Sequence, residues 1–272
     1  IVRLVGSEMC IRDRNITGYL IANMNLSVNL NKISLLRNAR GGGQPDIAWF
    51  AQKALEKDII GLTVHPRPDG RHIVYNDIKI IKDLTSAANK ELNIEGNPVE
   101  PSNQEYKGYI NLINESKPTQ ATLVPDDTNQ ITSDHGWMEN QRDELTTYTK
   151  EIANSVEFLS IFVDSDIENL SDILNPDISA IEIFTGPYAI AMASDDNKRI
   201  DQELKKIATL ATSAQKLGLK VNAGHDLTTD NLKNLVELNL IDEVSIGHAI
   251  ITQSLEYGYE QTLDKYLEII NG

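Results

Sequence analysis

The chain has a single cysteine, Cys10, among its 272 residues. One thiol cannot form an internal disulfide, which excludes a disulfide-stabilised scaffold and favours a reducing, cytoplasmic location. No apolar run is long enough to span a bilayer, so we expect no membrane segment. Positive charge is also scarce, because 25 Lys and Arg stand against 40 Asp and Glu, giving a net charge of −15. A chain this acidic would repel a phosphate backbone, which argues against general nucleic-acid binding.

The first 23 residues lack a regular pattern. Ile1 to Arg14 has a short apolar patch, but neither a signal peptide with a cleavage site nor a capped helix. Regular alternation begins at Met24-Asn-Leu-Ser-Val-Asn-Leu-Asn. We expect residues 1–23 to be a non-native or disordered appendage and residues 24–272 to form one domain. Mass spectrometry of the protein made from its native locus tests this expectation, because a mature chain containing residues 1–23 would contradict it.

Eight short apolar, β-branched runs recur along the chain, with helical periodicity between them. This alternation is typical of βαβ units around a parallel sheet. The predicted strands are 26–30, 59–64, 92–94, 120–124, 158–163, 180–184, 219–222 and 243–246. Helical spacing is clear at 46–57, 142–155, 197–217 and 229–238. Eight repeats in a chain of this length indicate a single-domain (β/α)8 barrel with a closed, parallel, eight-stranded sheet.

Histidines lie at the predicted carboxyl ends of several strands, where the active site of a (β/α)8 barrel is found. His65, His225 and His248 follow three different strands, and His72 follows His65 on the same loop. A single histidine is more often a structural hydrogen-bonding group than a catalyst. Several on one rim favour acid–base catalysis, because imidazole titrates near neutral pH.

Two glutamates interrupt apolar strands. Glu95 follows Leu-Asn-Ile, and Glu182 lies within Ala-Ile-Glu-Ile-Phe. Burying an unpaired carboxylate is costly, so each must be paired, hydrated or protonated. A structural ion pair with arginine or lysine is one interpretation. A catalytic carboxylate with a raised pKa is the other.

Glycines and basic residues indicate phosphate subsites. Gly224-His225 and Gly247-His248 follow the seventh and eighth predicted strands, where barrels often bind phosphate through backbone N–H groups. Basic residues also gather between positions 31 and 75, although a solvated surface is the alternative: Lys32, Arg37, Arg40, Arg67 and Arg71. No HxH or HExxH pair occurs, so we expect no metal site. Gly41-Gly42-Gly43 does not match a nucleotide-binding loop and is more typical of a mobile one.

Four motifs resemble the pyridoxine 5′-phosphate synthase family. They are Val28–Gly41, Gly61–Ile73, Leu219–His225 and Ile246–Ile250, and the similarity runs in order over about residues 26–270. The resemblance implies a (β/α)8 barrel that assembles into homo-oligomers, typically octamers. It also implies a transferase of vitamin B6 biosynthesis that needs no cofactor. The expected reaction condenses 3-amino-2-oxopropyl phosphate with 1-deoxy-D-xylulose 5-phosphate, giving pyridoxine 5′-phosphate, inorganic phosphate and water.

The same resemblance implies roles for individual residues. His65 and Glu95 match the proton acceptors of the family, His225 its proton donor, and Glu182 a further active-site carboxylate. Positions that match substrate-holding residues, mainly for the deoxyxylulose phosphate, are Asn29, Asn31, Lys32, Arg40, Arg67, His72 and Thr132. Positions that match those around the aminoketone phosphate are Asp226, Gly247 and His248.

The chain departs from the family pattern at three places, one of which is the stretch Gly96–Lys107 after Glu95. Asn31-Lys32 stands where the family often has Asp-His, and Asp226 stands where it often has Gly. Substrate affinity is the property that these changes would alter. Two other functions therefore stay open: a phosphate-binding barrel epimerase or isomerase, and a catalytically silent protein that binds phosphorylated metabolites. For the enzyme we expect one loop to close over the site, either 132–137 or 41–43.

Overall fold

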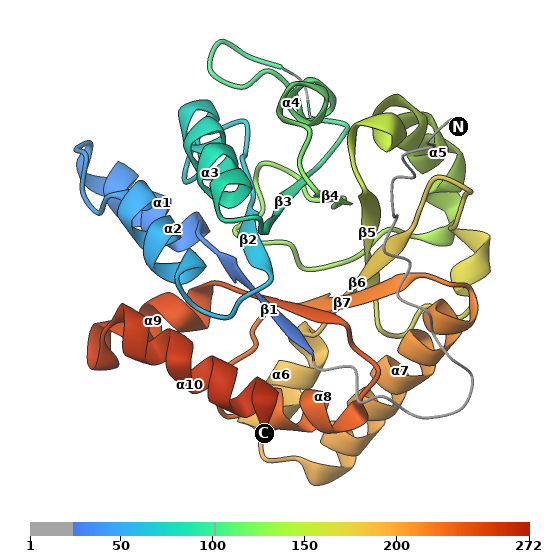
Figure 1. The fold of residues 1–272 in the computed structure, drawn as a ribbon. Coiled ribbons are helices and arrows are strands. Elements are labelled where there is room, and N and C mark those ends of the chain that lie inside the picture. The colour runs from blue at the N-terminus through green and yellow to red at the C-terminus, as the bar shows by residue number, and fades with distance from the viewer. Residues whose placement is uncertain (1–23, 101) are drawn as a thin grey trace, which may run out of the picture.

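Eight parallel strands close into a barrel that is surrounded by helices (Figure 1). The computed structural model describes residues 24–100 and 102–272, so the prediction for residues 1–23 lies outside the described residues. The strands are β1 Asn25–Asn29, β2 Gly61–Val64, β3 Glu91–Gly96, β4 Gln120–Leu123, β5 Phe158–Asp164, β6 Ala180–Phe184, β7 Lys220–Gly224 and β8 Glu243–Ile246. Each strand pairs with the next, and β8 pairs with β1. The predicted (β/α)8 barrel is confirmed.

Helices follow every strand except β5, after which the described chain forms only the short 3₁₀ helix η3, Leu170–Asp172. They are α1 Asn31–Arg40, α2 Ile47–Leu55, α3 Tyr75–Ala87, α4 Tyr109–Ser116, α5 Arg142–Ile152, α6 Gly186–Ala193, α7 Asn197–Lys216, α8 Leu232–Leu238, α9 His248–Tyr257 and α10 Tyr259–Asn271. The 3₁₀ helices η1 Glu139–Gln141 and η2 Ala153–Ser155 flank α5. Within the described part of the chain, no helix is long and apolar enough to cross a bilayer.

The hydrophobic core lies between the barrel and its helices. Strand residues alternate, and the outward positions are apolar: Leu62 and Val64 on β2, for example, and Leu92 and Ile94 on β3 are fully buried. Helices such as α3 present buried residues, including Ile81, to this surface. These outward residues belong to the short apolar runs from which the strands were predicted, because helices must cover the outer face of each strand.

The inside of the barrel is polar. Ser27 and Thr63 share a hydrogen bond of 2.7 Å between β1 and β2. Asn222 on β7 donates to Oε1 of Gln120 on β4 at 3.2 Å. Because β7 and β4 are not neighbours in the sheet, this bond crosses the interior. Barrel interiors are more often filled by branched apolar side chains, so this one is held by hydrogen bonds instead.

A buried charge cluster closes the amino-terminal end of the barrel. Lys220 Nζ lies 2.7 Å from Glu243, 3.2 Å from Glu91 and 3.4 Å from the amide oxygen of Gln120. Burial alone would lower the pKa of Lys220, but the charges of Glu243 and Glu91 outweigh it and raise that pKa. Lys220 is therefore a permanent cation that joins β3, β4, β7 and β8. The candidate site lies at the opposite end of the barrel, where the strands have their carboxyl ends.

Candidate active site

His65 follows β2 at the carboxyl rim of the barrel and is held by its backbone. Its N–H donates to Oδ1 of Asn31 at 2.8 Å, and the N–H of Asn31 donates to Oδ1 of Asn29 at 3.0 Å. The β1–α1 turn thereby fixes the end of β2. Asn29 and Asn31, which the sequence assigned to substrate, serve in this structure to orient the rim.

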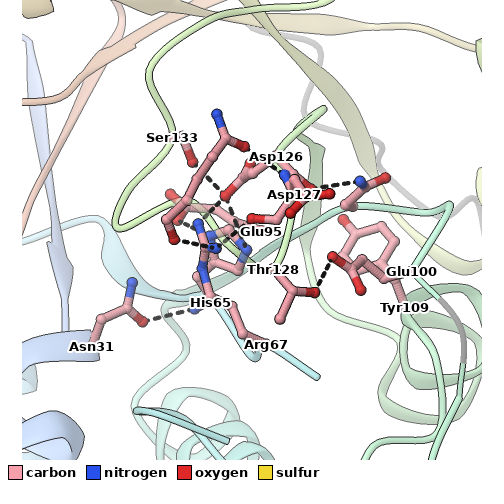
Figure 2. Close-up of polar contacts among 12 residues, drawn as sticks. Asn31, His65, Arg67, Glu95, Glu100, Tyr109, Asp126, Asp127, Thr128 and Ser133 are labelled. Carbon is pink, nitrogen blue, oxygen red and sulfur yellow. Dashed lines mark hydrogen bonds and ion pairs between the residues drawn. The ribbon is translucent and has the colours of Figure 1, made fainter. Parts of the chain in front are cut away.

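The His65 imidazole lies between two carboxylates, as Figure 2 shows. Nδ1 is 3.6 Å from Oε2 of Glu95, and Nε2 is 3.9 Å from Oδ2 of Asp126. Both distances exceed a direct hydrogen bond, so the ring can approach either side with a small movement. Burial, together with the positive charges of Arg67, His225 and Arg71, lowers the pKa of His65 well below its ordinary value. A neutral imidazole can accept a proton.

Two arginines of the β2–α3 loop hold the loop that follows β4. Arg67 forms an ion pair with Asp126, and its Nη1 donates to the carbonyls of Asp127 and Gln130 at 3.3 Å (Figure 2). Arg71 donates to the carbonyl of Gln130 at 2.7 Å. Arg67 matches a substrate-holding position but is engaged here by protein groups.

Asp126 was not among the predicted site residues. The sequence did contain one signal, since Pro125-Asp126 directly follows a predicted strand and therefore lies on the rim. What could not be read was its pairing with Arg67, because the two residues are 59 positions apart. Tertiary structure alone brings them together.

Glu95 and Glu182 are both buried and both resist ionisation. Burial raises the pKa of Glu95 well above its ordinary value, and the negative charges of Glu182 and Asp126 add to the effect. Burial, with the charge of Glu243, raises the pKa of Glu182 to about 8. Oε2 of Glu182 has no hydrogen-bond partner among the described residues. Among the described residues, neither glutamate forms an ion pair with arginine or lysine, which was the alternative interpretation. A raised pKa suits a carboxyl that exchanges protons.

His225 follows β7 in a strained backbone conformation. Its φ is +85°, and Asp226 follows with φ +55°. The Thr185 hydroxyl donates to the carbonyls of Gly224 and His225, which stabilises the turn. The imidazole lies 5.4 Å from the ring centroids of both Phe162 and Phe184. Burial lowers the pKa of His225, and Asp226 opposes this shift. Strain of this kind is characteristic of functional sites.

The left-handed φ of Asp226 explains why glycine is common at this position in the resembled family. Aspartate is one of the few other residues that tolerate this conformation. The Asp226 side chain is exposed, and its carbonyl accepts from Nδ2 of Asn231 at 3.0 Å. Gly247 precedes α9, and a Cβ there would lie 2.9 Å from Cβ of Asn29. His248 begins α9 and is exposed. Glycine at position 247 therefore lets the amino terminus of α9 approach β1.

The remaining predicted residues differ in their distance from the cluster around His65. The His72 ring lies 6.0 Å from that of His65, and burial lowers its pKa to about 3. The charges of His65, Arg67 and Lys32 contribute to the lowering of this pKa. Thr132 is exposed on the β4–α5 loop. Arg40 is exposed in the last turn of α1, roughly 13 Å along the helix from Asn31. The structure does not bring Arg40 to the cluster.

The fold defines the chain as a (β/α)8-barrel protein, with a buried cluster of acidic and basic side chains at the carboxyl rim of the barrel. Solved structures share the fold at low identity. Tryptophan synthase from Mycobacterium tuberculosis has a TM-score of 0.61 at 10% identity, covering 92% of this chain and 93% of that one. Thiamine phosphate pyrophosphorylase from Pyrococcus furiosus has 0.54 at 11%, covering 92% and 96%. At these identities the likeness shows the fold alone.

Sequence comparison identifies the family. The family model described as "Pyridoxal phosphate biosynthesis protein PdxJ" matches residues 26–272. The pyridoxine 5′-phosphate synthase of Xylella fastidiosa strain 9a5c is 42% identical over 250 residues, covering 90% of this chain and 94% of the relative. That of Xanthomonas axonopodis pv. citri is 41% identical over 250 residues, covering 90% and 96%. The chain belongs to the pyridoxine 5′-phosphate synthase family, enzymes of vitamin B6 biosynthesis.

Proposed function

We propose that this enzyme condenses 3-amino-2-oxopropyl phosphate with 1-deoxy-D-xylulose 5-phosphate to form pyridoxine 5′-phosphate, inorganic phosphate and water, without a cofactor. One observation supports this beyond family membership. His65, Glu95, Glu182 and His225 come from four different strands and lie close enough to influence one another: the charge of His225 lowers the pKa of His65, and that of Glu182 raises the pKa of Glu95. A small ligand at the rim would meet all four.

The proposed chemistry is a series of proton transfers. Joining an amine to a ketone, eliminating water, losing phosphate and closing a ring each require a proton to be taken or given. His65, which is neutral, and Glu95 accept protons in this proposal. His225 donates one, and Glu182 provides a further carboxyl whose pKa of about 8 allows both roles at neutral pH.

Two phosphate subsites are proposed from the surrounding donors. For the deoxyxylulose phosphate, Arg67 and Lys32 supply positive charge, and Asn29, Asn31, His72 and Thr132 are the further proposed contacts. For the aminoketone phosphate, the backbone at Gly247 and His248 opens α9, and Asp226 lies on the adjacent turn. Helix amino termini favour anions, because their N–H groups are unpaired and the helix dipole is positive there.

We also propose that the enzyme is a cytoplasmic homo-oligomer, an octamer as in the resembled family. Large apolar side chains are exposed on α1, α2 and α9: Leu36 is 49% exposed, Trp49 46% and Leu255 81%. Contact between copies would bury such residues. Analytical ultracentrifugation of the purified protein tests this proposal, and a monomer at micromolar concentration would contradict it.

Ring formation is the decisive test of the reaction. The protein is mixed with both substrates, and the fluorescence of the pyridoxine ring and the release of phosphate are followed together. We expect the two signals to rise in step and to require both substrates. Turnover of one substrate alone would indicate an epimerase or isomerase. Binding of both without ring formation would indicate a catalytically silent protein.

A further inference from the structure

Asp126 lies in a loop, but both its backbone and its side chain are fixed by burial and hydrogen bonds. It leaves β4 at the rim, and its side chain is almost fully buried, with the residue 3% exposed. Its carbonyl accepts a hydrogen bond of 2.6 Å from Nδ2 of Asn97, which follows β3. Backbone and side chain are therefore both fixed, and the carboxylate has a defined direction relative to β2 and β3.

The two oxygens of this carboxylate have different surroundings. Oδ2 forms the ion pair with Arg67 and accepts a hydrogen bond of 2.9 Å from the hydroxyl of Ser133. The same oxygen lies 3.9 Å from Nε2 of His65 (Figure 2). Oδ1 is buried and has no hydrogen-bond partner among the described residues. A purely structural ion pair would satisfy both oxygens, because an unpaired buried acceptor is costly. Oδ1 remains available to a donor that approaches from the site.

Asp126 and Glu95 flank His65 unequally. Asp126 pairs with the guanidinium of Arg67 and accepts from the hydroxyl of Ser133. Among the described residues, Glu95 accepts a 3.5 Å hydrogen bond from the amide of Asn29 and lies 3.6 Å from Nδ1 of His65. A carboxyl group with few partners that stabilise its charge has a higher proton affinity when a second carboxylate lies nearby. The negative charge of Asp126 is among the causes that raise the pKa of Glu95.

We propose that Asp126 is a positioning residue of the synthase site, which orients Arg67 and places a fixed negative charge beside Glu95 that strengthens Glu95 as a proton acceptor. This inference rests on the proposed roles of His65, Glu95 and Arg67. It assigns to Asp126 an effect on the reaction that is exerted through these neighbours. No contact between Asp126 and substrate is required.

The test removes the negative charge of Asp126 and keeps the shape of its side chain. Asp126→Asn should lower kcat at least about tenfold and raise the KM for 1-deoxy-D-xylulose 5-phosphate severalfold, because Arg67 loses its anchor. Removing the negative charge also lowers the pKa of Glu95, so the pH–rate limb set by Glu95 should move to lower pH. Other charged or titratable groups face Glu95 and stay unchanged in this variant: His65 and Arg67 after β2, Tyr109 on α4, and Glu182 on β6.

Asp127→Asn is the matched control. It removes the same charge one residue further on, from an exposed side chain that, within the described part of the chain, accepts hydrogen bonds only from Asn129. Its kinetics and pH profile should equal those of the wild type. Equal effects of the two substitutions would overturn the proposal, since net charge would then be the cause. So would a folded Asp126→Asn enzyme with an unshifted pH limb.

Asp126→Glu keeps the test valid if the Asn variant does not fold. This variant retains the anion, so its pH limb should stay where the wild type has it even if kcat falls. A shift of the Glu95 limb of the pH–rate profile in the Asp126→Glu variant, relative to the wild type, would overturn the proposal. Wild-type ring formation is measured first. Its absence would contradict the proposed function, whereas an active wild type with an unaffected Asp126→Asn enzyme contradicts only the role of Asp126.

Discussion

The carboxylate of Glu182 occupies the space that a side chain on Gly224 would need, since a Cβ at Gly224 would overlap Oε1 of Glu182. These residues lie on the neighbouring strands β6 and β7, and both belong to the inside of the barrel. Glycine at position 224 is therefore required by close approach, and not by an unusual backbone angle. Because Gly224 has no side chain, the Glu182 side chain can extend to the rim of the barrel.

Gly224→Ala should displace Glu182 and impair the enzyme. We expect turnover to fall at least about tenfold and the free energy of unfolding to fall by about 1–3 kcal/mol, as for overpacking in a tight interior. Steady-state kinetics and denaturant titration measure the two effects. Gly42→Ala is the control, because a Cβ at Gly42 meets nothing within 4 Å. A fully active Gly224→Ala enzyme would show that the position of Glu182 is unimportant.

His225→Asn should lower turnover by roughly a hundredfold or more while the protein stays folded. Asparagine tolerates the left-handed φ of this position, so the turn should survive. Circular dichroism verifies folding, and ring formation measures activity. His135→Asn provides the comparison, because His135 lies in the β4–α5 loop and its ring contacts Asp134 and Gln130. Near-normal turnover of the His225 variant would rule out proton donation by this residue.

Glu182→Gln should change how stability depends on pH. The pKa of Glu182 is about 8 in the folded enzyme and near 4.5 ordinarily. The folded state therefore favours the protonated form, and this group destabilises the fold progressively as pH rises from about 4.5 to about 8. Glutamine stays neutral throughout. Relative to the wild type, the Gln variant should gain stability between about pH 5 and about pH 8 in urea titrations, and a constant difference would refute the shift.

Lys220→Met should destabilise the barrel strongly. It leaves Glu243 and Glu91 buried or half-buried without their cation, which typically costs about 3–5 kcal/mol. Chemical denaturation measures the loss. The double variant Lys220→Met with Glu243→Gln should recover part of it, because one uncompensated charge is gone. Lys233→Met, which removes a lysine from an exposed pair 3.9 Å from Glu237, should change stability little.

The sequence predicted all eight strands because short apolar, β-branched runs recur along the chain with segments of helical periodicity between them. Their ends were less well defined. The seventh strand was predicted to end at Asn222 but continues to Gly224, which pairs with Phe184 and Ser245. Glycine is rare in strands, so the sequence pattern that indicates a strand ends before Gly224, where β7 approaches the site. That error placed Gly224 in a loop, whereas the structure places it inside the barrel.

Positions at the rim were predictable where a strand alone determined them. His65, Glu95, Glu182 and His225 were placed in this way, and in the structure their charges lie near enough to influence one another. Their catalytic roles stay predictions. Pairings across the barrel were not predictable. Asp126 with Arg67 and Lys220 with Glu91 depend on strands that meet only when the sheet closes. Arg40 was included by likeness and lies apart from the cluster, at the far end of α1.

The alternation of the strands has a consequence for how such an enzyme can diverge. On β3, Ile94 packs against the helices while its neighbour Glu95 faces the rim. Two consecutive residues of one strand therefore differ in role: Ile94 stabilises the scaffold, and Glu95 faces the candidate site. Substitutions on the inner face can redirect reactivity while the outer contacts persist, so new specificities can arise by single changes without a compensating redesign of the scaffold.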